Sequence, residues 1–85
     1  MNVDAEVGKI DALLALLGEC QESQVTRIAG EHLQGARIYL LGAMTNEYKV
    51  NLDLARQAAG AISDHGIRQK ANHIVSGLME AEQVR

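Results

Sequence analysis

Residues 46–62, NEYKVNLDLARQAAGAI, decide the fold. Drawn as a helix with about 100° between residues, this stretch carries one apolar stripe that returns every three or four positions. The stripe consists of Tyr48, Leu52, Ala55, Ala59 and Ile62. A second apolar stripe, consisting of Val50, Leu54, Ala58 and Ala61, runs beside it. Because the two stripes together cover more than half of the circumference, we predict a helix that is buried on two sides.

The same helical spacing of apolar residues extends over the rest of the chain. It predicts helices at about 4–18, 23–42, 46–62 and 66–83. Gly18 suits the end of the first helix, and Asp64 suits the N-cap of the fourth. No proline stands between residues 42 and 46, so the second and third helices can also be one continuous helix. We therefore expect an all-α fold, a small antiparallel bundle of three to four helices.

The predicted second helix has one core-facing stripe and two large apolar residues outside it. The stripe consists of Val25, Ile28, Ala29, Leu33, Ala36 and Leu40. Ile38 and Leu41 fall on the far side of the same helix. Together with the second stripe of residues 46–62, they give more apolar surface than one small bundle can cover. Such surface marks binding sites, so we predict that Ile38, Leu41, Val50, Leu54, Ala58 and Ala61 contact a partner or another subunit.

Length and composition point to one small domain that is completed by self-association. A chain of 85 residues has room for one domain, residues 1–85. Apolar residues make up 47 % and charged residues 22 % of it, which is the balance of a globular domain. Alanine supplies much of the apolar mass, and a domain this small buries a modest share of its surface. We therefore expect a homo-oligomer, with a symmetric dimer as the commonest form.

The charge of the chain narrows its partners and its compartment. Eight Lys and Arg stand against eleven Asp and Glu, a net charge of −3, and the basic residues are scattered. No basic face is therefore expected for a nucleic acid or a membrane surface. The N-terminus carries Asp4 and Glu6 where a secretion signal needs basic residues, and the single Cys20 cannot form an internal disulfide. A cytoplasmic location is the simplest expectation.

No pattern typical of catalysis, metal binding or cofactor binding stands out. The histidines, His32, His65 and His73, lack the spacing of a metal-binding helix motif. Glycine-rich phosphate-binding motifs are also missing from the sequence. Cys20 has no fixed basic neighbour in sequence that would activate its thiol. We accordingly predict a protein that is not an enzyme and that carries no metal and no cofactor.

One segment resembles a known family. Glu31-His32-Leu33-Gln34-Gly35-Ala36, followed by Leu41-Gly42-Ala43, is similar to the phosphorylatable segment of histidine phosphotransfer domains. Gly42 lies ten residues after His32, as in that family, whereas Gln34 stands where those domains have lysine. The resemblance implies a helical bundle in which His32 accepts a phosphoryl group. The apolar spacing, in contrast, places His32 on the buried side of the second helix, where a packing role is expected.

The preferred prediction is a non-enzymatic protein–protein interaction module that acts as a small regulator, inhibitor or adaptor. A histidine phosphotransfer-like signalling domain that uses His32 is the alternative. A small helical DNA-binding regulator ranks below both. It would need donors such as Arg27, Gln34 and Arg37 on an exposed helix face, and the acidic chain disfavours it.

Overall fold

The computed structural model describes residues 3–20 and 23–83. This part of the chain forms four helices and no strand: α1 (Val3–Gly18), α2 (Ser23–Leu41), α3 (Thr45–Ala59) and α4 (His65–Gln83). The predicted all-α fold is therefore confirmed for the described residues. Seven of the eight predicted helix ends lie within one residue of the observed ends. The exception is the end of α3, which lies at Ala59 and not at residue 62.

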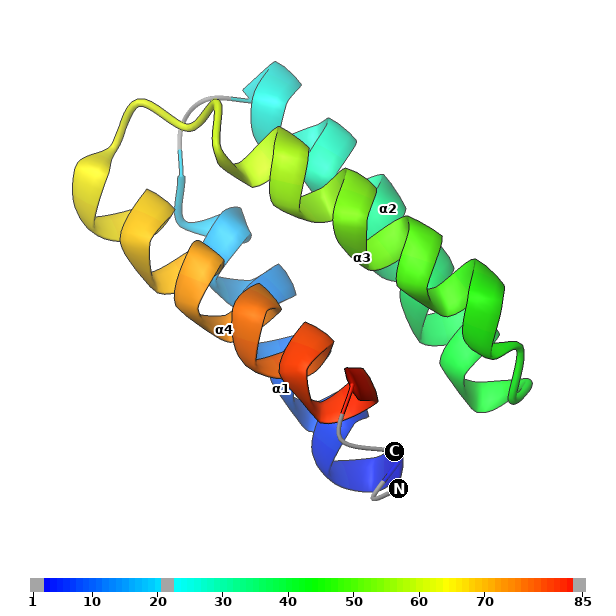
Figure 1. Ribbon diagram of the computed structural model, residues 1–85. Coiled ribbons are helices and arrows are strands. Elements are labelled where there is room, and N and C mark those ends of the chain that lie inside the picture. The colour runs from blue at the N-terminus through cyan, green and yellow to red at the C-terminus, as the bar shows by residue number, and fades with distance from the viewer. Residues whose placement is uncertain (1–2, 21–22, 84–85) are drawn as a thin grey trace.

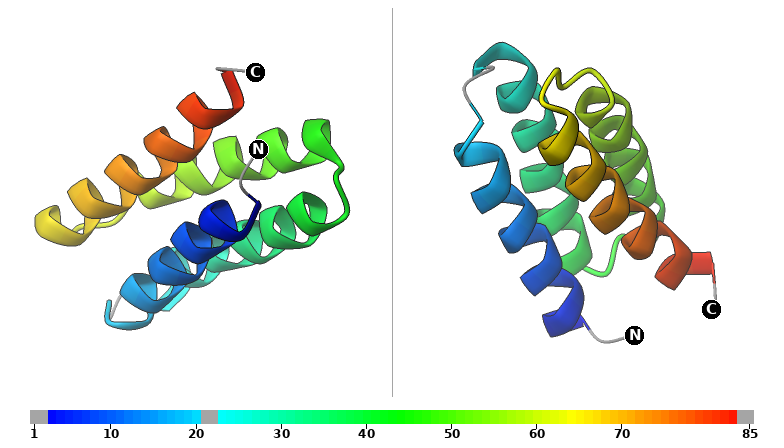
Figure 2. Two further views of the ribbon diagram at one scale, coloured as in Figure 1. Left: turned by 90° about the horizontal axis from the view of Figure 1, so that it is seen from below. Right: turned by 90° about the vertical axis from the view of Figure 1, so that its left-hand side faces the viewer.

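The helices form an antiparallel bundle in which each packs beside two others (Figure 1). The neighbours around the ring are α1 with α2, α2 with α3, α3 with α4, and α4 with α1. The contact between α2 and α3 is the most extensive. The bundle measures 34 × 19 × 19 Å. The turn between α2 and α3 lies at the same end as the start of α1 and the end of α4 (Figure 2).

The core follows the predicted stripes. The first stripe of residues 46–62 is fully buried, from Tyr48 to Ile62. The other buried apolar residues are Ile10, Leu13 and Leu17 of α1, Ala29, Leu33, Ala36 and Leu40 of α2, and Ala71, Val75 and Leu78 of α4. One residue of the predicted core stripe is placed wrongly: Ile28 is 41 % exposed. It lies at the edge of the α2 stripe, beyond the arc that α1 and α3 cover.

A tight turn separates α2 from α3, so the two are not one continuous helix. The amide of Met44 donates to the carbonyl of Tyr39 at 2.8 Å, and the amide of Ala43 donates to the carbonyl of Leu40 at 3.1 Å. These two bonds are the pair that defines a Schellman motif. The residue between Gly42 and Met44 must then adopt a left-handed conformation, and Ala43 does so with a φ of 58°. Gly42, the expected break, lies one residue before this position.

The end of α3 and the start of α4 are fixed by backbone and side-chain hydrogen bonds. Ile62 donates its amide to the carbonyl of Ala59 at 3.1 Å, which closes the chain into a turn past Gly60. Ile62 nevertheless remains in the core, because this turn points its side chain inward. The carboxylate of Asp64 then accepts the amide of Ile67 at 3.0 Å. The prediction that Asp64 caps the fourth helix is confirmed.

Candidate interaction surface

The second stripe of residues 46–62 is open to solvent in the single chain. Val50 is 58 % and Leu54 37 % exposed. Ala58 is half-buried and packs against the core, whereas Ala61 is exposed in the turn after α3. Large apolar side chains that remain in water at the surface of a bundle are candidates for contact with another molecule.

On α2, the structure separates the two predicted interface residues. Ile38 is 67 % exposed and lies opposite the core stripe. Leu41 is 57 % exposed, but it follows Arg37 by one turn, and Arg37 faces α1 through its ion pair with Asp11 at 3.0 Å. Leu41 therefore lies on the α1 side of the helix. Ile28, which sequence spacing assigned to the core, shares a side with Ile38 instead.

We call the exposed apolar residues on the α2–α3 hairpin, Ile28, Ile38, Val50 and Leu54, the outer face. On α2, Glu31 and Gly35 lie on the same side of the helix as Ile28 and Ile38. The four residues are separated by three, four and three positions, which is the spacing of residues along one side of a helix. On α3, Glu47 begins the corresponding run to Val50 and Leu54. The outer face is therefore a surface built by two helices together.

The two helices approach closely at Gly35. A Cβ built on Gly35 would lie 2.7 Å from Oδ1 of Asn51. Asn51 is held in place because its amide donates to the carbonyl of Glu47 at 2.8 Å. Glycine at this position lets the helices come together, so its role in packing lies within the chain. The same contact fixes the register between α2 and α3.

A hollow opens on the outer face beside this contact. Its volume is about 300 Å³, and it is lined by Tyr39, Asn46, Glu47, Val50 and Asn51. Tyr39 comes from α2 and the other four residues come from α3, so the hollow lies in the groove between the helices. Its lining combines Tyr39 and Val50 with three polar residues, Asn46, Glu47 and Asn51.

The charged groups around the outer face fall into two classes. On the other side of α3, Asp53 accepts hydrogen bonds from Arg56 at 2.7 Å and from Gln57 at 2.9 Å. The Arg56 hydrogen bond, followed by that of Gln57, lowers the pKa of Asp53 below its ordinary value of 3.8. Glu31 and Glu47, in contrast, are exposed and have no ion-pair partner among the described residues.

His32 lies half-buried on α2. It is neither enclosed in the core, as the apolar spacing suggested, nor fully open to solvent. His32 lies beside the buried stripe of α2, since buried Leu33 directly follows it and buried Ala29 precedes it by about one turn. The phosphotransfer alternative, which needs an accessible imidazole, stays a prediction.

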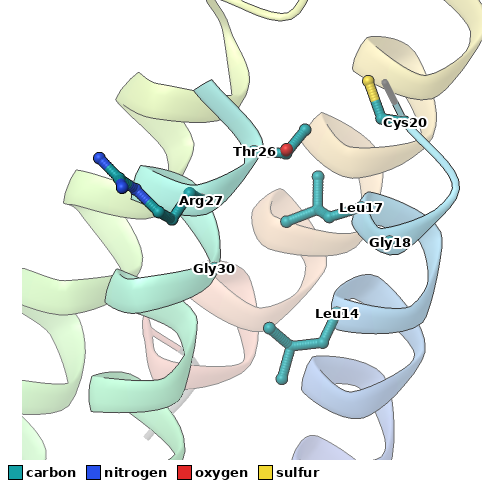
Figure 3. Close-up of a pocket in the computed structure, with 7 residues that line it drawn as sticks. All are labelled: Leu14, Leu17, Gly18, Cys20, Thr26, Arg27 and Gly30. Atoms are coloured by element: carbon teal, nitrogen blue, oxygen red, sulfur yellow. The ribbon is translucent and has the colours of Figure 1, made fainter. Parts of the chain in front are cut away.

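A second hollow lies between α1 and α2, at the end of the bundle where these helices are joined (Figure 3). It has a volume of about 480 Å³. Leu14 and Leu17 point from α1 into it, whereas the side chain of Arg27 extends away from α1 (Figure 3). Its other lining residues are Gly18, Cys20, Thr26 and Gly30. Arg27 is the one charged residue among the seven that line this hollow.

Two features of the described residues bear on function class. Within residues 3–20 and 23–83, no group of three or more His, Cys, Asp and Glu side chains is arranged to hold a metal ion. In the same part of the chain, none of the helices combines the length and hydropathy that crossing a bilayer requires. The chain matches no family model, no curated protein and no solved structure.

Sequence inspection missed one residue of note. Glu6 is 5 % exposed, and it is the one charged side chain that is buried among the described residues. It belongs to the first turn of α1, where the positive end of the helix dipole stabilises a carboxylate. A search for apolar stripes passes over such a position, although Glu6 lies one turn before Ile10 on the core side of the wheel.

Proposed function

We propose that this protein is a non-enzymatic interaction module that binds another protein surface through the outer face. The observation that supports the proposal is the exposure of Ile38, Val50 and Leu54 on the two helices that pack together most extensively. The close approach of Gly35 to Asn51 sets the register of the two helices and with it the relative positions of these three residues. Burying this surface on a partner would be favourable by about 25 cal/mol per Å².

The proposed module acts by binding to the surface of a partner protein, as a small regulator, inhibitor or adaptor does. The residues around the outer face offer apolar contact and, in Glu31 and Glu47, two exposed carboxylates that have no ion-pair partner among the described residues. Self-association is the form of binding that the small core and the symmetric preference of oligomers favour. At micromolar concentration we expect a mass of at least twice 9.2 kDa in light scattering.

Two substitutions on α3 separate an interface from the core. Leu54→Asp places a carboxylate on the outer face, where a partner would have to bury it, and a buried unpaired charge costs several kcal/mol. We expect a helical, folded monomer. Leu52→Asp places the same charge at a residue with no exposed surface, and we expect it to unfold the chain.

Circular dichroism and light scattering, measured together, distinguish these outcomes. Ala12→Asp, at an exposed position of α1, is the matched control and should keep both the helical signal and the mass. If Leu54→Asp keeps the mass and stability of the wild-type protein, the outer face is not an interface and the proposal fails.

A further inference from the structure

We propose that the turn between α2 and α3 is a strained hinge through which two copies of this chain swap halves. When the turn opens, α1 and α2 of one copy pack with α3 and α4 of the other. The product is a domain-swapped dimer that contains two complete bundles. This inference goes beyond the proposed function, because it does not require the outer face to be an interface.

The closed turn holds an alanine in a backbone conformation that glycine adopts far more readily. Ala43 has a φ of 58°, whereas Gly42, one position earlier, has no positive φ. Met44, at the N-cap of α3, lacks the side-chain oxygen with which a Ser, Thr, Asp or Asn caps a helix start. Short hinge loops under strain favour domain swapping. Opening the turn releases Ala43 from the left-handed conformation.

The swap keeps each of the four helix–helix contacts that the described bundle has. The contacts of α1 with α2 and of α3 with α4 stay within one chain, since their connections remain closed. The contacts of α2 with α3 and of α1 with α4 form again between the two copies. The contact of α2 with α3 is the most extensive one in the bundle, so its recovery between copies offsets what the opening removes.

The register of the hairpin is compatible with the swap. Gly35 precedes Ala43 by eight residues, and Asn51, which Gly35 approaches closely, follows Ala43 by eight. A two-fold axis that passes between the two copies of Ala43 therefore brings Gly35 of one copy to the level of Asn51 of the other. A swapped dimer needs the closed contact to form in this way between copies.

The hinge stays non-helical in the open form. Sixteen residues of an unbroken helix turn the side chains by about 160°, so Gly35 and Asn51 would point in nearly opposite directions. An extended hinge of three residues, 42–44, spans about 10 Å and lets the two helices take the rotation that the contact needs. Extended backbone has a negative φ, which alanine adopts without strain.

The closed and swapped forms interconvert slowly, because the most extensive contact of the bundle must break first. A chain therefore selects its form while it folds. High protein concentration during refolding favours the swapped dimer, since its formation needs two chains, whereas dilution favours the closed monomer. Concentrating a protein that has already folded leaves its form unchanged.

A pair of cysteines across the contact of α2 with α3 reports the swap. Gly35→Cys and Asn51→Cys are made together in a Cys20→Ser background. Cγ of Asn51 lies 3.3 Å from a Cβ built on Gly35, so a disulfide between the two cysteines is within reach. In the closed form this disulfide joins two residues of one chain, whereas in the swapped dimer it joins two chains. Non-reducing gel electrophoresis separates the two products.

The yield of covalent dimer should depend on the refolding concentration and on residue 43. We expect covalent dimers after refolding at millimolar concentration, and cross-linked monomers after refolding at micromolar concentration. Ala43→Gly removes the strain from the closed form, a change of about tenfold for each chain, so the dissociation constant of the swapped dimer should rise about a hundredfold. Ala12→Gly makes the same replacement at an exposed position of α1, and this matched control should leave the yield unchanged.

Two results would overturn this inference. One is a yield of cross-linked monomers alone at every refolding concentration, and the other is an equal yield of covalent dimer with Ala43 and with Ala43→Gly. Leu54→Asp separates the inference from the proposed function. It should abolish binding through the outer face and leave the yield of covalent dimer unchanged, so either idea can fail while the other stands.

Discussion

Replacing Ala43 by glycine should stabilise the protein, because Ala43 holds a backbone conformation that alanine disfavours. Its φ of 58° lies in the left-handed region, and two hydrogen bonds of the Schellman motif hold it there. Glycine adopts this region without a clash, since it has no Cβ. Gly42, in contrast, has no positive φ, so the glycine of this turn stands one residue before the position that needs it.

The magnitude follows from two opposing contributions. The left-handed conformation costs an alanine about 1–2 kcal/mol, which Ala43→Gly removes. Glycine also loses about 0.4–1 kcal/mol more backbone entropy on folding than alanine does. The net stabilisation expected is about 1 kcal/mol, or about 4–8 °C in Tm for a domain of this size. In the exchange variant Gly42→Ala with Ala43→Gly, the composition is unchanged, so the second contribution cancels and the gain rises to about 1–2 kcal/mol.

Urea unfolding followed by the helical circular dichroism signal measures these changes. It should be carried out at several protein concentrations, because self-association would make the midpoint depend on concentration. The exchange variant is sterically allowed. A Cβ on Gly42 would lie 3.5 Å from the carbonyl oxygen of Ile38, which is an ordinary van der Waals contact. Ala12→Gly, on the exposed side of α1, is the control of opposite sign and should cost about 1 kcal/mol.

The result that would refute this account is a loss of stability in Ala43→Gly of the size seen in Ala12→Gly. Residue 43 would then have an ordinary helical or extended backbone, and α2 would end in a different way. A second refuting result is an exchange variant that is no more stable than the wild-type chain.

Three further predictions concern α2 and α3. Gly35→Ala should gain about 1 kcal/mol in an Asn51→Ala background, where helix propensity acts alone, and should gain less or lose stability in the wild-type chain, where its Cβ meets Asn51; a double-mutant cycle in urea measures the coupling. The pKa of Asp53 is lowered by Arg56, so its stabilising effect is present above the unfolded pKa of about 3.9 and is lost as the pH falls through the lower folded value. The stability difference between the wild-type chain and Asp53→Asn should therefore shrink below about pH 4, and a difference that stays constant from pH 7 to pH 2 would contradict this. For His32, we expect His32→Gln to change stability alone and phosphoramidate to leave the wild-type ring unmodified, whereas a phosphorylated His32 would favour the phosphotransfer alternative.

Apolar spacing was enough to predict the four helices and most of the core. Tyr48 and Leu52 were assigned to the buried stripe, and neither has exposed surface. Ile28 was assigned wrongly, because a helical wheel shows which residues share a side but not how wide an arc the neighbouring helices cover. Since α1 and α3 flank α2 and no described helix lies over its outer side, Ile28 is left at the edge. For the same reason, the wheel did not show that Leu41 lies on the α1 side of α2 whereas Ile38 lies opposite the core stripe.

Other features depended on backbone geometry that residue types alone do not fix. Gly42 indicated a helix end, but the left-handed residue is Ala43, and the choice between them depends on which amide reaches the carbonyl of Tyr39. The hollow beside Val50 also exists because α2 and α3 meet at Gly35 in one register. The sequence does not indicate that Asn51 of the same chain is the residue that Gly35 approaches.

The unequal packing around the ring sets an order of opening for the native bundle. α2 and α3 share the largest contact and are joined by a turn of three residues, 42–44, so their contacts are local in sequence and close with little loss of chain entropy. α1 and α4 share the smallest contact and come from opposite ends of the chain. Local fluctuations should therefore part α1 from α4 before they disturb the hairpin, and the amides of α2 and α3 should be the last to exchange their hydrogens with solvent. The helices that carry the outer face would then keep their shape while the rest of the bundle breathes.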